Sequence, residues 1–365
     1  MKKFQFLLVA PTCTLLFHLV VLAATSDDLN SEHSADNYME NPNSTEDSEP
    51  ALAHRVTFRF RPVIGNWDQQ RAEWLEKYPH KRLTAQGRPR TILVTSSPPH
   101  QCEHPTGDIF QLRSIKNKID YGRLHMVDVY YNMVVMEMDG FWVKLPIIRR
   151  LMLQHPEAEW IWWMDSDAVF IDMDFQIPFE NYQGINMIIP GWDDAVYDRR
   201  EWIGLNAGIF LIRNCQWSLD FLDLWGALGE DYGDHKTIMG EFVSKELTGR
   251  SGFEIDDQAG LIWLLISRPE LRPQVFLESS YLLHSYWVGV APRLEEMLAE
   301  FQSGGERWPF ITHFVGCKLC SGKYNSTSLE MCEDESTRAF NFADDQVLKP
   351  YGYRHTSLPQ PELVD

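Results

Sequence analysis

The sequence predicts an α/β domain in which helices flank a mostly parallel sheet. Short apolar segments of strand length alternate with longer segments of helical periodicity, and this alternation is typical of such domains. A hydrophobic content of 44% over 365 residues supplies a large core. The expected strands are 91–95, 127–135, 159–164, 186–190 and 207–213, and the expected helices are 107–125, 141–154, 216–228 and 256–267.

Local signals support these elements in chain order. The first strand is apolar and ends in the turn Ser-Ser-Pro-Pro at 96–99. The apolar residues on one face of the first helix are Ile109, Leu112, Ile115 and Ile119. The strand 159–164 is aromatic and apolar, and Asp256 is placed to cap the last helix. Ligands bind at the carboxyl ends of strands in such sheets, so the residues that follow 164 are the first candidates for a site.

The net charge of −19 argues against nucleic acid as a partner, because phosphate backbones require surfaces rich in Lys and Arg. A bound nucleotide diphosphate would have to be neutralised locally, by a metal ion or a few placed bases. Thirteen Trp residues favour a carbohydrate ligand weakly, since indole rings stack on sugars.

The N-terminus carries a membrane-targeting signal. Lys2 and Lys3 precede a largely apolar stretch, 4–24, that is long enough to span a bilayer. We expect residues 1–25 to form a cytosolic tip and signal anchor, with a cleaved signal peptide as the alternative. Either way the remainder is luminal or secreted, and the sequons at Asn43 and Asn325 agree with that compartment.

An acidic stem is expected between the anchor and the domain. Residues 27–50 contain eight acids and no Lys or Arg, which favours a disordered spacer. We assign 26–89 to a luminal stem and 90–365 to the catalytic domain.

Six cysteines are present, and Cys13 lies in the membrane stretch. The remaining five allow at most two disulfides, and we expect Cys332 to bridge to Cys317 or Cys320. A zinc site at Cys317-x-x-Cys320 is the alternative, although no second Cys or His pair stands at the required spacing.

The first candidate site is Asp165-Ser166-Asp167, which follows directly on an apolar strand. Carboxylates at i and i+2 of an extended chain point the same way, and a divalent cation offsets their repulsion. A diphosphate would supply the remaining oxygen ligands of Mg²⁺ or Mn²⁺. A solvated surface turn is the bland alternative, and a calcium loop is disfavoured because Phe170 stands where such a loop needs glycine.

The second candidate is the segment 312–318. His313 could be a third metal ligand, and an imidazole beside carboxylates suits Mn²⁺ better than Mg²⁺. Gly316 permits close approach of the backbone to a phosphate, and Lys318 offers it a point charge. Taken alone, His313 is more often a core histidine than a ligand.

The third candidate is Asp256-Asp257-Gln258. Two acids before an apolar helix can simply cap it and favour its dipole, which accounts for Asp256. Capping does not require Asp257 or Gln258, which could face a sugar's hydroxyl groups and anomeric centre.

Taken together, these segments resemble glycosyltransferase family 34, which includes plant xyloglucan 6-xylosyltransferases and galactomannan galactosyltransferases. The resemblance runs from about residue 90 to about residue 353 and is carried by the motifs at 162–168, 204–208, 214–219, 256–258, 312–318 and 338–342. It implies a GT-A fold, with a Rossmann-like sheet, and a retaining enzyme that uses Mn²⁺ and a UDP-sugar. It also implies a single-pass type II protein of the Golgi membrane.

The resemblance also implies roles for individual residues. Asp165, Asp167 and His313 are similar to the manganese ligands, and Gly316 and Lys318 to diphosphate contacts. Asn206, Asp256, Asp257 and Gln258 match positions that line the donor sugar and reaction centre. Lys144 matches a donor-side lysine, and Ser166 lies among the donor-binding residues. Departures from the family pattern are Ser96, Ser285 and Leu319, which put the fine shape of the donor pocket and acceptor groove in doubt.

The two branches of the family remain open at this point. Xylosyl transfer to a β-1,4-glucan is favoured over galactosyl transfer to a mannan. A glycoside hydrolase and a non-catalytic partner in a Golgi complex are the competing classes of protein. The expected partners are the UDP-sugar, a polysaccharide or oligosaccharide acceptor, the Golgi membrane and, in a homo- or hetero-oligomer, related transferases.

Overall fold

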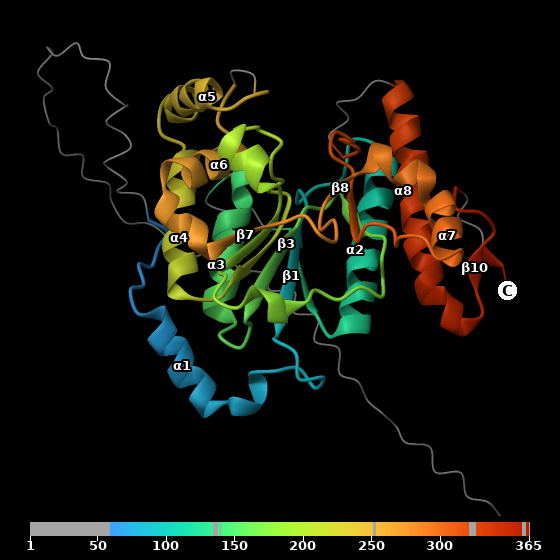
Figure 1. Ribbon diagram of the computed structural model, residues 1–365, viewed down its shortest axis with the longest axis horizontal. Helices are drawn as coiled ribbons and strands as arrows, with labels where there is room; N and C mark the ends of the chain where they lie inside the picture. The colour runs from blue at the N-terminus through green and yellow to red at the C-terminus, as the bar shows by residue number, and fades with distance from the viewer. Residues whose placement is uncertain are drawn as a thin grey trace, which may run out of the picture. The chain divides into compact units, whose positions relative to one another are not determined.

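The computed structural model describes residues 59–133, 138, 140–250, 253–320, 326–359 and 363–364 (Figure 1). The chain divides into a unit over 1–51 and a compact unit over 52–365, and the described residues all belong to the second unit. The expected signal anchor and the sequon asparagines Asn43 and Asn325 lie outside the described residues. Within the described ranges, no helix is long and apolar enough to cross a membrane.

A six-stranded sheet forms the centre of the domain, in the order β2-β1-β3-β6-β5-β7. Its strands are β1 (Thr91–Ser96), β2 (Asp128–Asn132), β3 (Trp160–Met164), β5 (Met187–Pro190), β6 (Ile209–Arg213) and β7 (Val275–Glu278). Strand β6 is antiparallel to both of its neighbours, and the remaining pairs are parallel. The mostly parallel α/β sheet predicted from the sequence is therefore confirmed, with one reversed strand at its centre.

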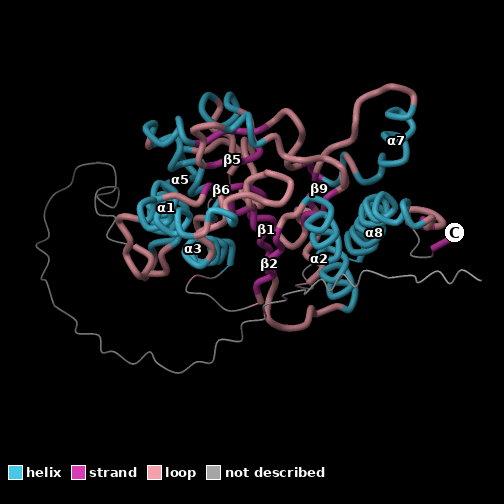
Figure 2. Tube along the Cα trace, turned by 90° about the horizontal axis from the view of Figure 1, so that it is seen from below, coloured by secondary structure: helices cyan, strands magenta, loops and turns pink. Residues whose placement is uncertain are grey.

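Helices cover both faces of the sheet, with α3, α4 and α6 on one face and α2 on the other, and α8 packs on the outer side of α2 (Figures 1 and 2). The helices are α1 (Trp67–Lys77), α2 (Pro105–His125), α3 (Lys144–Gln154), α4 (Gln216–Gly226), α5 (His235–Glu246), α6 (Asp257–Ser267), α7 (Leu294–Gln302) and α8 (Ser326–Leu348). Successive side chains of β3 belong to different core clusters: Trp163 to the one built with α3, α4 and α6, and Trp162 to the one that includes Tyr121 of α2. Burial on both faces explains why this strand is apolar throughout.

A small second sheet brings distant segments of the chain together. It has the order β4-β9-β8, with β4 (Ala168–Phe170), β9 (Ile311–His313) and β8 (Ser285–Tyr286). Ala168 pairs with His313 across the antiparallel β4–β9 ladder. This register places His313 beside the Asp165-Ser166-Asp167 turn. A further two-stranded sheet consists of β10 (Arg354–His355) and β11 (Leu363–Val364).

The segment 59–89, the part of the expected stem that the structure describes, packs against the domain, and the acidic stretch 27–50 lies outside the described residues. Phe60 and Trp67 are buried in the main core. The Trp67 indole donates a 2.7 Å hydrogen bond to Asn214, and its backbone amide donates to Gln216. The folded region thus begins before residue 90, and composition alone does not reveal this because only a few side chains of the segment are buried.

Helix α2 turns a polar face toward the interior. Ile109 and Leu112 are 47% and 67% exposed, whereas Ser114, Asn117 and Lys118 are buried. An apolar helix face ordinarily packs on the core. Here the buried polar face instead binds the backbone of residues 166–170.

Two disulfides stabilise the C-terminal part of the domain. Cys317 bridges to Cys332 and Cys102 to Cys320, while Cys215 is the free cysteine among the described residues. The expected bridge from Cys332 is confirmed. Because Cys317 and Cys320 belong to different disulfides, the zinc alternative is wrong.

Candidate active site and metal centre

Asp165, Asp167 and His313 converge at the carboxyl end of β3. Each offers one ligand atom, and these atoms all lie within 4.8 Å of one another. The His313 Nε2 atom lies 2.9 Å from Asp167 Oδ1 and 3.9 Å from Asp165 Oδ2. Two carboxylates and an imidazole within one coordination sphere fit a divalent cation.

The charges of this cluster depend on one another. Burial disfavours the charged forms of both His313 and Asp167. Their mutual attraction outweighs it, raising the pKa of His313 and holding the pKa of Asp167 below its usual range. The His313 imidazole and the Asp167 carboxylate, 2.9 Å apart, therefore favour each other's charged forms.

Trp163 and Gly208 fix the position of Asp165. The Trp163 indole donates a 2.6 Å hydrogen bond to Asp165 Oδ1, and the Asp165 amide donates to the Gly208 carbonyl over 2.8 Å. A Cβ atom on Gly208 would come within 2.5 Å of His313 Cε1 and 2.6 Å of Asp165 Oδ2. Only glycine leaves room for the metal ligands here, and the sequence analysis did not single out this residue or Trp163.

Lys144 and Asp257 form a buried ion pair beside the cluster. The Lys144 Nζ atom lies 2.7 Å from Asp257 Oδ2 and 3.7 Å from Asp165 Oδ1, and it donates to the Ala207 carbonyl over 2.8 Å. Burial raises the pKa of Asp257 to about 6, although Lys144 opposes the shift. Lys144 therefore binds the two acidic segments of the site to each other and to the start of β6.

The rest of the third candidate has structural contacts in this site. Asp256 caps α6, as the sequence predicted, by accepting from the Ala259 amide at 2.7 Å. The Gln258 side chain accepts from the Ala207 amide at 3.2 Å and donates to the Trp202 carbonyl at 2.9 Å. Gln258 thus connects α6 to the segment before β6, at the edge of the metal cluster.

Asn206 and Ser166 are oriented by neighbouring groups. Asn206 Oδ1 accepts from the Gly208 amide at 2.9 Å, which orders the turn before β6. Ser166 Oγ accepts from Gln111 of α2 at 3.2 Å. Both residues lie in the turns that carry the site.

The segment after His313 forms an exposed loop. Gly316 and Lys318 are exposed, and Gly316 has a φ of 89°, a conformation that favours glycine. The flanking residues Cys317 and Cys320 are anchored by the two disulfides. The loop that carries Lys318 therefore follows His313 directly in the chain and is bounded by two disulfide-bonded cysteines.

His284 is a further neighbour that the sequence analysis did not assign to the site. Its ring meets that of His313 edge-on, with 5.2 Å between ring centroids. Burial, with help from His313, lowers the pKa of His284 to about 3, so this imidazole is neutral near pH 7. It limits the space available on one side of the metal ligands.

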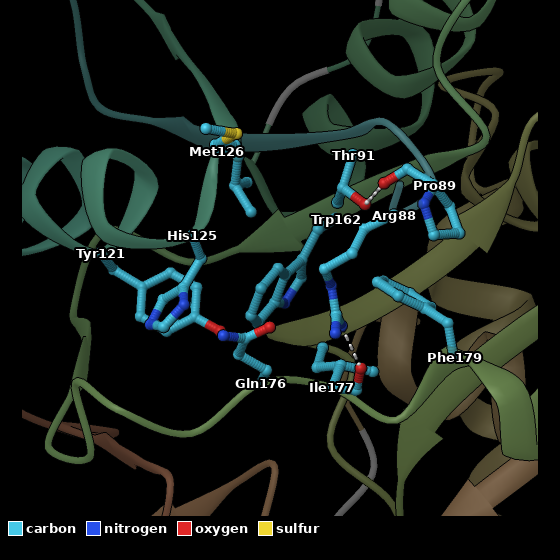
Figure 3. A pocket seen from close by; sticks show the side chains of 11 residues that line it. Arg88, Pro89, Thr91, Tyr121, His125, Met126, Trp162, Gln176, Ile177 and Phe179 are labelled. Atoms are coloured by element: carbon cyan, nitrogen blue, oxygen red, sulfur yellow. Dashed lines mark hydrogen bonds between the residues drawn. The ribbon is translucent and has the colours of Figure 1, made fainter. Parts of the chain in front are cut away.

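A separate small cavity lies at the opposite end of the sheet (Figure 3). It is lined by Thr91 at the start of β1 and by Arg88, His125 and Trp162, and measures about 20 Å³. That is room for about one water molecule, so the cavity is not a donor or acceptor site.

Comparisons with known proteins agree with this geometry. Residues 87–324 match the galactosyl transferase GMA12/MNN10 family. The chain is 48% identical over 323 residues to a protein of Arabidopsis thaliana named probable xyloglucan 6-xylosyltransferase 5, covering 87% of this chain and 70% of the relative. It is also 48% identical over 307 residues to xyloglucan 6-xylosyltransferase 1 of the same plant, covering 82% of this chain and 66% of the relative.

Among solved structures, a glycosyltransferase involved in glycosylation of the major capsid of PBCV-1 overlaps 67% of this chain and 99% of its own, at 12% identity and a TM-score of 0.41. At so low a TM-score and identity, this similarity carries no argument about the chain. On the family match and the identity to its relatives, the chain belongs to the galactosyl transferase GMA12/MNN10 family, glycosyltransferase family 34, and is a glycosyltransferase.

Proposed function

We propose that this chain transfers xylose from UDP-xylose to a β-1,4-glucan, with retention of the anomeric configuration. Support for the sugar and acceptor comes from relatives named as xyloglucan 6-xylosyltransferases, at 48% identity. The observation that carries the transfer chemistry is the cluster of Asp165, Asp167 and His313 beside the Gly316–Lys318 loop.

The proposed cofactor is Mn²⁺, held by the two carboxylates and the His313 imidazole. This ligand set suits Mn²⁺ better than Mg²⁺ because an imidazole accompanies the oxygens. A bound ion would neutralise the diphosphate and stabilise charge on the departing UDP. In the proposal, Lys318 adds a positive charge on the same side, and the Gly316 backbone allows the phosphate to approach closely.

A front-face route is the proposed path to retention. A double displacement needs a carboxylate that is free to attack the anomeric carbon. Asp257, the nearest candidate in sequence, is 4% exposed and held by Lys144 at 2.7 Å. In the proposal Asp257 holds sugar hydroxyls, and the Gln258 side-chain amide stabilises positive charge near the anomeric centre. Asp256 caps α6 and so fixes the start of the helix that carries both residues.

The proposed setting is the Golgi lumen, with the chain anchored as a single-pass type II membrane protein. Lys2, Lys3 and the apolar stretch 4–24 motivate the anchor. Two disulfides within the domain support an oxidising compartment. The acidic stretch 27–50 would space the domain from the membrane, and related transferases are the proposed oligomer partners.

The membrane anchor is tested by washing membranes with alkaline carbonate. The protein should remain in the membrane fraction, and a soluble product that begins near Ala24 would contradict the anchor.

The function is tested by product analysis with the full chain. UDP-xylose and UDP-galactose are each offered with cellohexaose or mannohexaose, and the linkage and anomeric configuration of the product are determined. We expect α-linked xylose on cellohexaose, dependent on Mn²⁺. Galactose on mannohexaose would instead assign the chain to the galactosyltransferase branch. Failure to release UDP with any acceptor would favour a non-catalytic partner.

A further inference from the structure

A buried lysine on α2 lies beneath the metal-binding turn. Lys118 is fully buried, and its Nζ atom donates to the Ala168 carbonyl and to Ser114 Oγ, each over 2.6 Å. Ser114 Oγ in turn donates to the Ser166 carbonyl over 2.5 Å. The two residues therefore bind the backbone carbonyls of Ser166 and Ala168, which flank Asp167.

The neighbouring residues of α2 extend this attachment along the chain. Gln111 donates to Ser166 Oγ over 3.2 Å. Asn117 donates to the Phe170 carbonyl over 2.9 Å and accepts from the Phe170 amide over 2.8 Å. One polar face of α2 thus holds the backbone from residue 166 to residue 170.

Lys118 is an expensive way to make these contacts. Taking an ammonium group out of water costs several kcal/mol in general unless a carboxylate pairs with it. Its hydrogen-bond partners are a carbonyl and a hydroxyl. Burial lowers the pKa of Lys118 to about 7, and the acids that oppose this shift are Asp167 and Asp165 of the metal centre. Ordinary core packing does not require a lysine at such a position.

We propose that Lys118 is a positioning residue of the metal centre: with Ser114 it fixes the turn that aims the Asp165 and Asp167 carboxylates at one cation. The inference rests on the proposed function, because it concerns the ion that would bind UDP. Outer residues that orient metal ligands typically change metal affinity by 10–100-fold when they are replaced.

The two physical roles of Lys118 predict opposite results. If Lys118 acted only as a nearby positive charge, removing it would tighten the binding of a cation. If it orients the turn, removing it loosens the ligands and weakens cation binding. The variant Lys118→Met keeps an unbranched side chain that is shorter by one atom and removes both the ammonium group and its hydrogen bonds, so the sign of its effect separates the two.

The test measures UDP binding to the full chain by calorimetry as Mn²⁺ is increased. We expect Lys118→Met to raise the Mn²⁺ concentration for half-maximal UDP binding by about 10–100-fold, with an unchanged melting temperature in EDTA. Lys116→Met is the matched control, because Lys116 is on the same helix, 48% exposed and paired with Asp120 and Asp344. It should leave the Mn²⁺ requirement unchanged.

Several outcomes would overturn the proposal. One is that Lys118→Met reaches half-maximal UDP binding at the same Mn²⁺ concentration as wild type or at a lower one. Another is that it needs more Mn²⁺ but also melts at a lower temperature in EDTA. If Lys118→Met does not fold, Ser114→Ala decides: a raised Mn²⁺ requirement supports the proposal and an unchanged one refutes it. If the wild-type chain itself binds no UDP with Mn²⁺, the proposed function fails instead.

Discussion

Two acidic pairs meet at the same edge of the sheet, and their surroundings differ. The side chains of Asp165 and Asp167 are 29% and 32% exposed. Those of Asp256 and Asp257 are 12% and 6% exposed. The first pair therefore keeps oxygen atoms accessible to a ligand, while the second is largely enclosed by protein.

Each acid of the second pair has a basic side chain nearby that is a lysine or an arginine. Lys144 lies 2.7 Å from Asp257, and Arg250 lies 3.7 Å from Asp256, which already caps α6. At the first pair, Lys144 is farther away, 3.7 Å from Asp165, and the nearest basic group is the His313 imidazole, 2.9 Å from Asp167. An acidic pair in a sequence is thus not sufficient to indicate a metal site, because the groups that neutralise it come from distant segments.

The largest effect on turnover is expected from Asp257→Ala. Asp257→Ala removes the carboxylate closest to the buried Lys144 and leaves Asp165 at 3.7 Å as its remaining acidic neighbour. Removing one partner of a buried ion pair costs roughly 3–5 kcal/mol of stability in general. We also expect the Asp257→Ala variant to lose most of its xylosyl transfer. In the wild type, we expect mass spectrometry to detect no covalent glycosyl-enzyme. The double variant Lys144→Met/Asp257→Leu should recover stability in urea unfolding without recovering turnover. A sugar adduct on Asp257 would make it the nucleophile and contradict the front-face route.

A smaller effect is expected from Gln258→Ala. Loss of one preorganised dipole near developing charge typically costs about 10²–10³-fold in kcat. Because Gln258 also connects α6 to Ala207 and Trp202, thermal unfolding must be measured beside turnover. If kcat falls only as far as the folded fraction does, the residue has no role in charge stabilisation.

The variant Gly208→Ala tests whether the first acidic pair and His313 need the space that glycine leaves between them. The added methyl group would meet His313 and Asp165 at 2.5 and 2.6 Å and displace these ligands. We expect about 10–100-fold weaker Mn²⁺-dependent UDP binding, the range found when ligand orientation is disturbed. Gly289→Ala is a suitable control, since nothing lies within 4 Å of a Cβ at that position. Equal UDP affinity in the two variants would place Gly208 outside the site.

The smallest effect on Mn²⁺ affinity is expected from a change of pH. The raised pKa of His313 means that its pairing with Asp167 stabilises the metal-free fold below about pH 6.5, and this stability is lost as pH rises through the folded pKa. Metal binding has the opposite dependence, because the ion needs the neutral imidazole. Mn²⁺ affinity should rise by up to about tenfold per pH unit below the folded pKa, with proton release seen in calorimetry in buffers of different ionisation enthalpy. Affinity that does not change with pH would exclude His313 as a ligand.

The sequence predicted five of the six strands of the central sheet and four of the eight described helices, and Asp165, Asp167 and His313, which it proposed as metal ligands, do lie close together. Asp165 and Asp167 follow a recognisable strand, and His313 lies in a motif of the family. Gly208 and Trp163 also lie in family motifs, at 204–208 and 162–168, but their particular contacts with Asp165 could not be predicted because they come from close approach between elements. Lys118 lies in none of these motifs. The inward polar face of α2 was hidden for the same reason: its partners are backbone carbonyls of the turn, which leave no signal in side-chain periodicity.

The central claim is that the first acidic pair holds a cation that binds UDP and the second does not. The most direct measurement is calorimetric UDP binding to the full chain with Mn²⁺ and with EDTA, in wild type, Asp167→Asn and Asp256→Asn. The account predicts Mn²⁺-dependent binding in wild type, its loss in Asp167→Asn, and its retention in Asp256→Asn, where the cap is weakened but the metal ligands remain. Unchanged, Mn²⁺-dependent UDP binding in Asp167→Asn would contradict it.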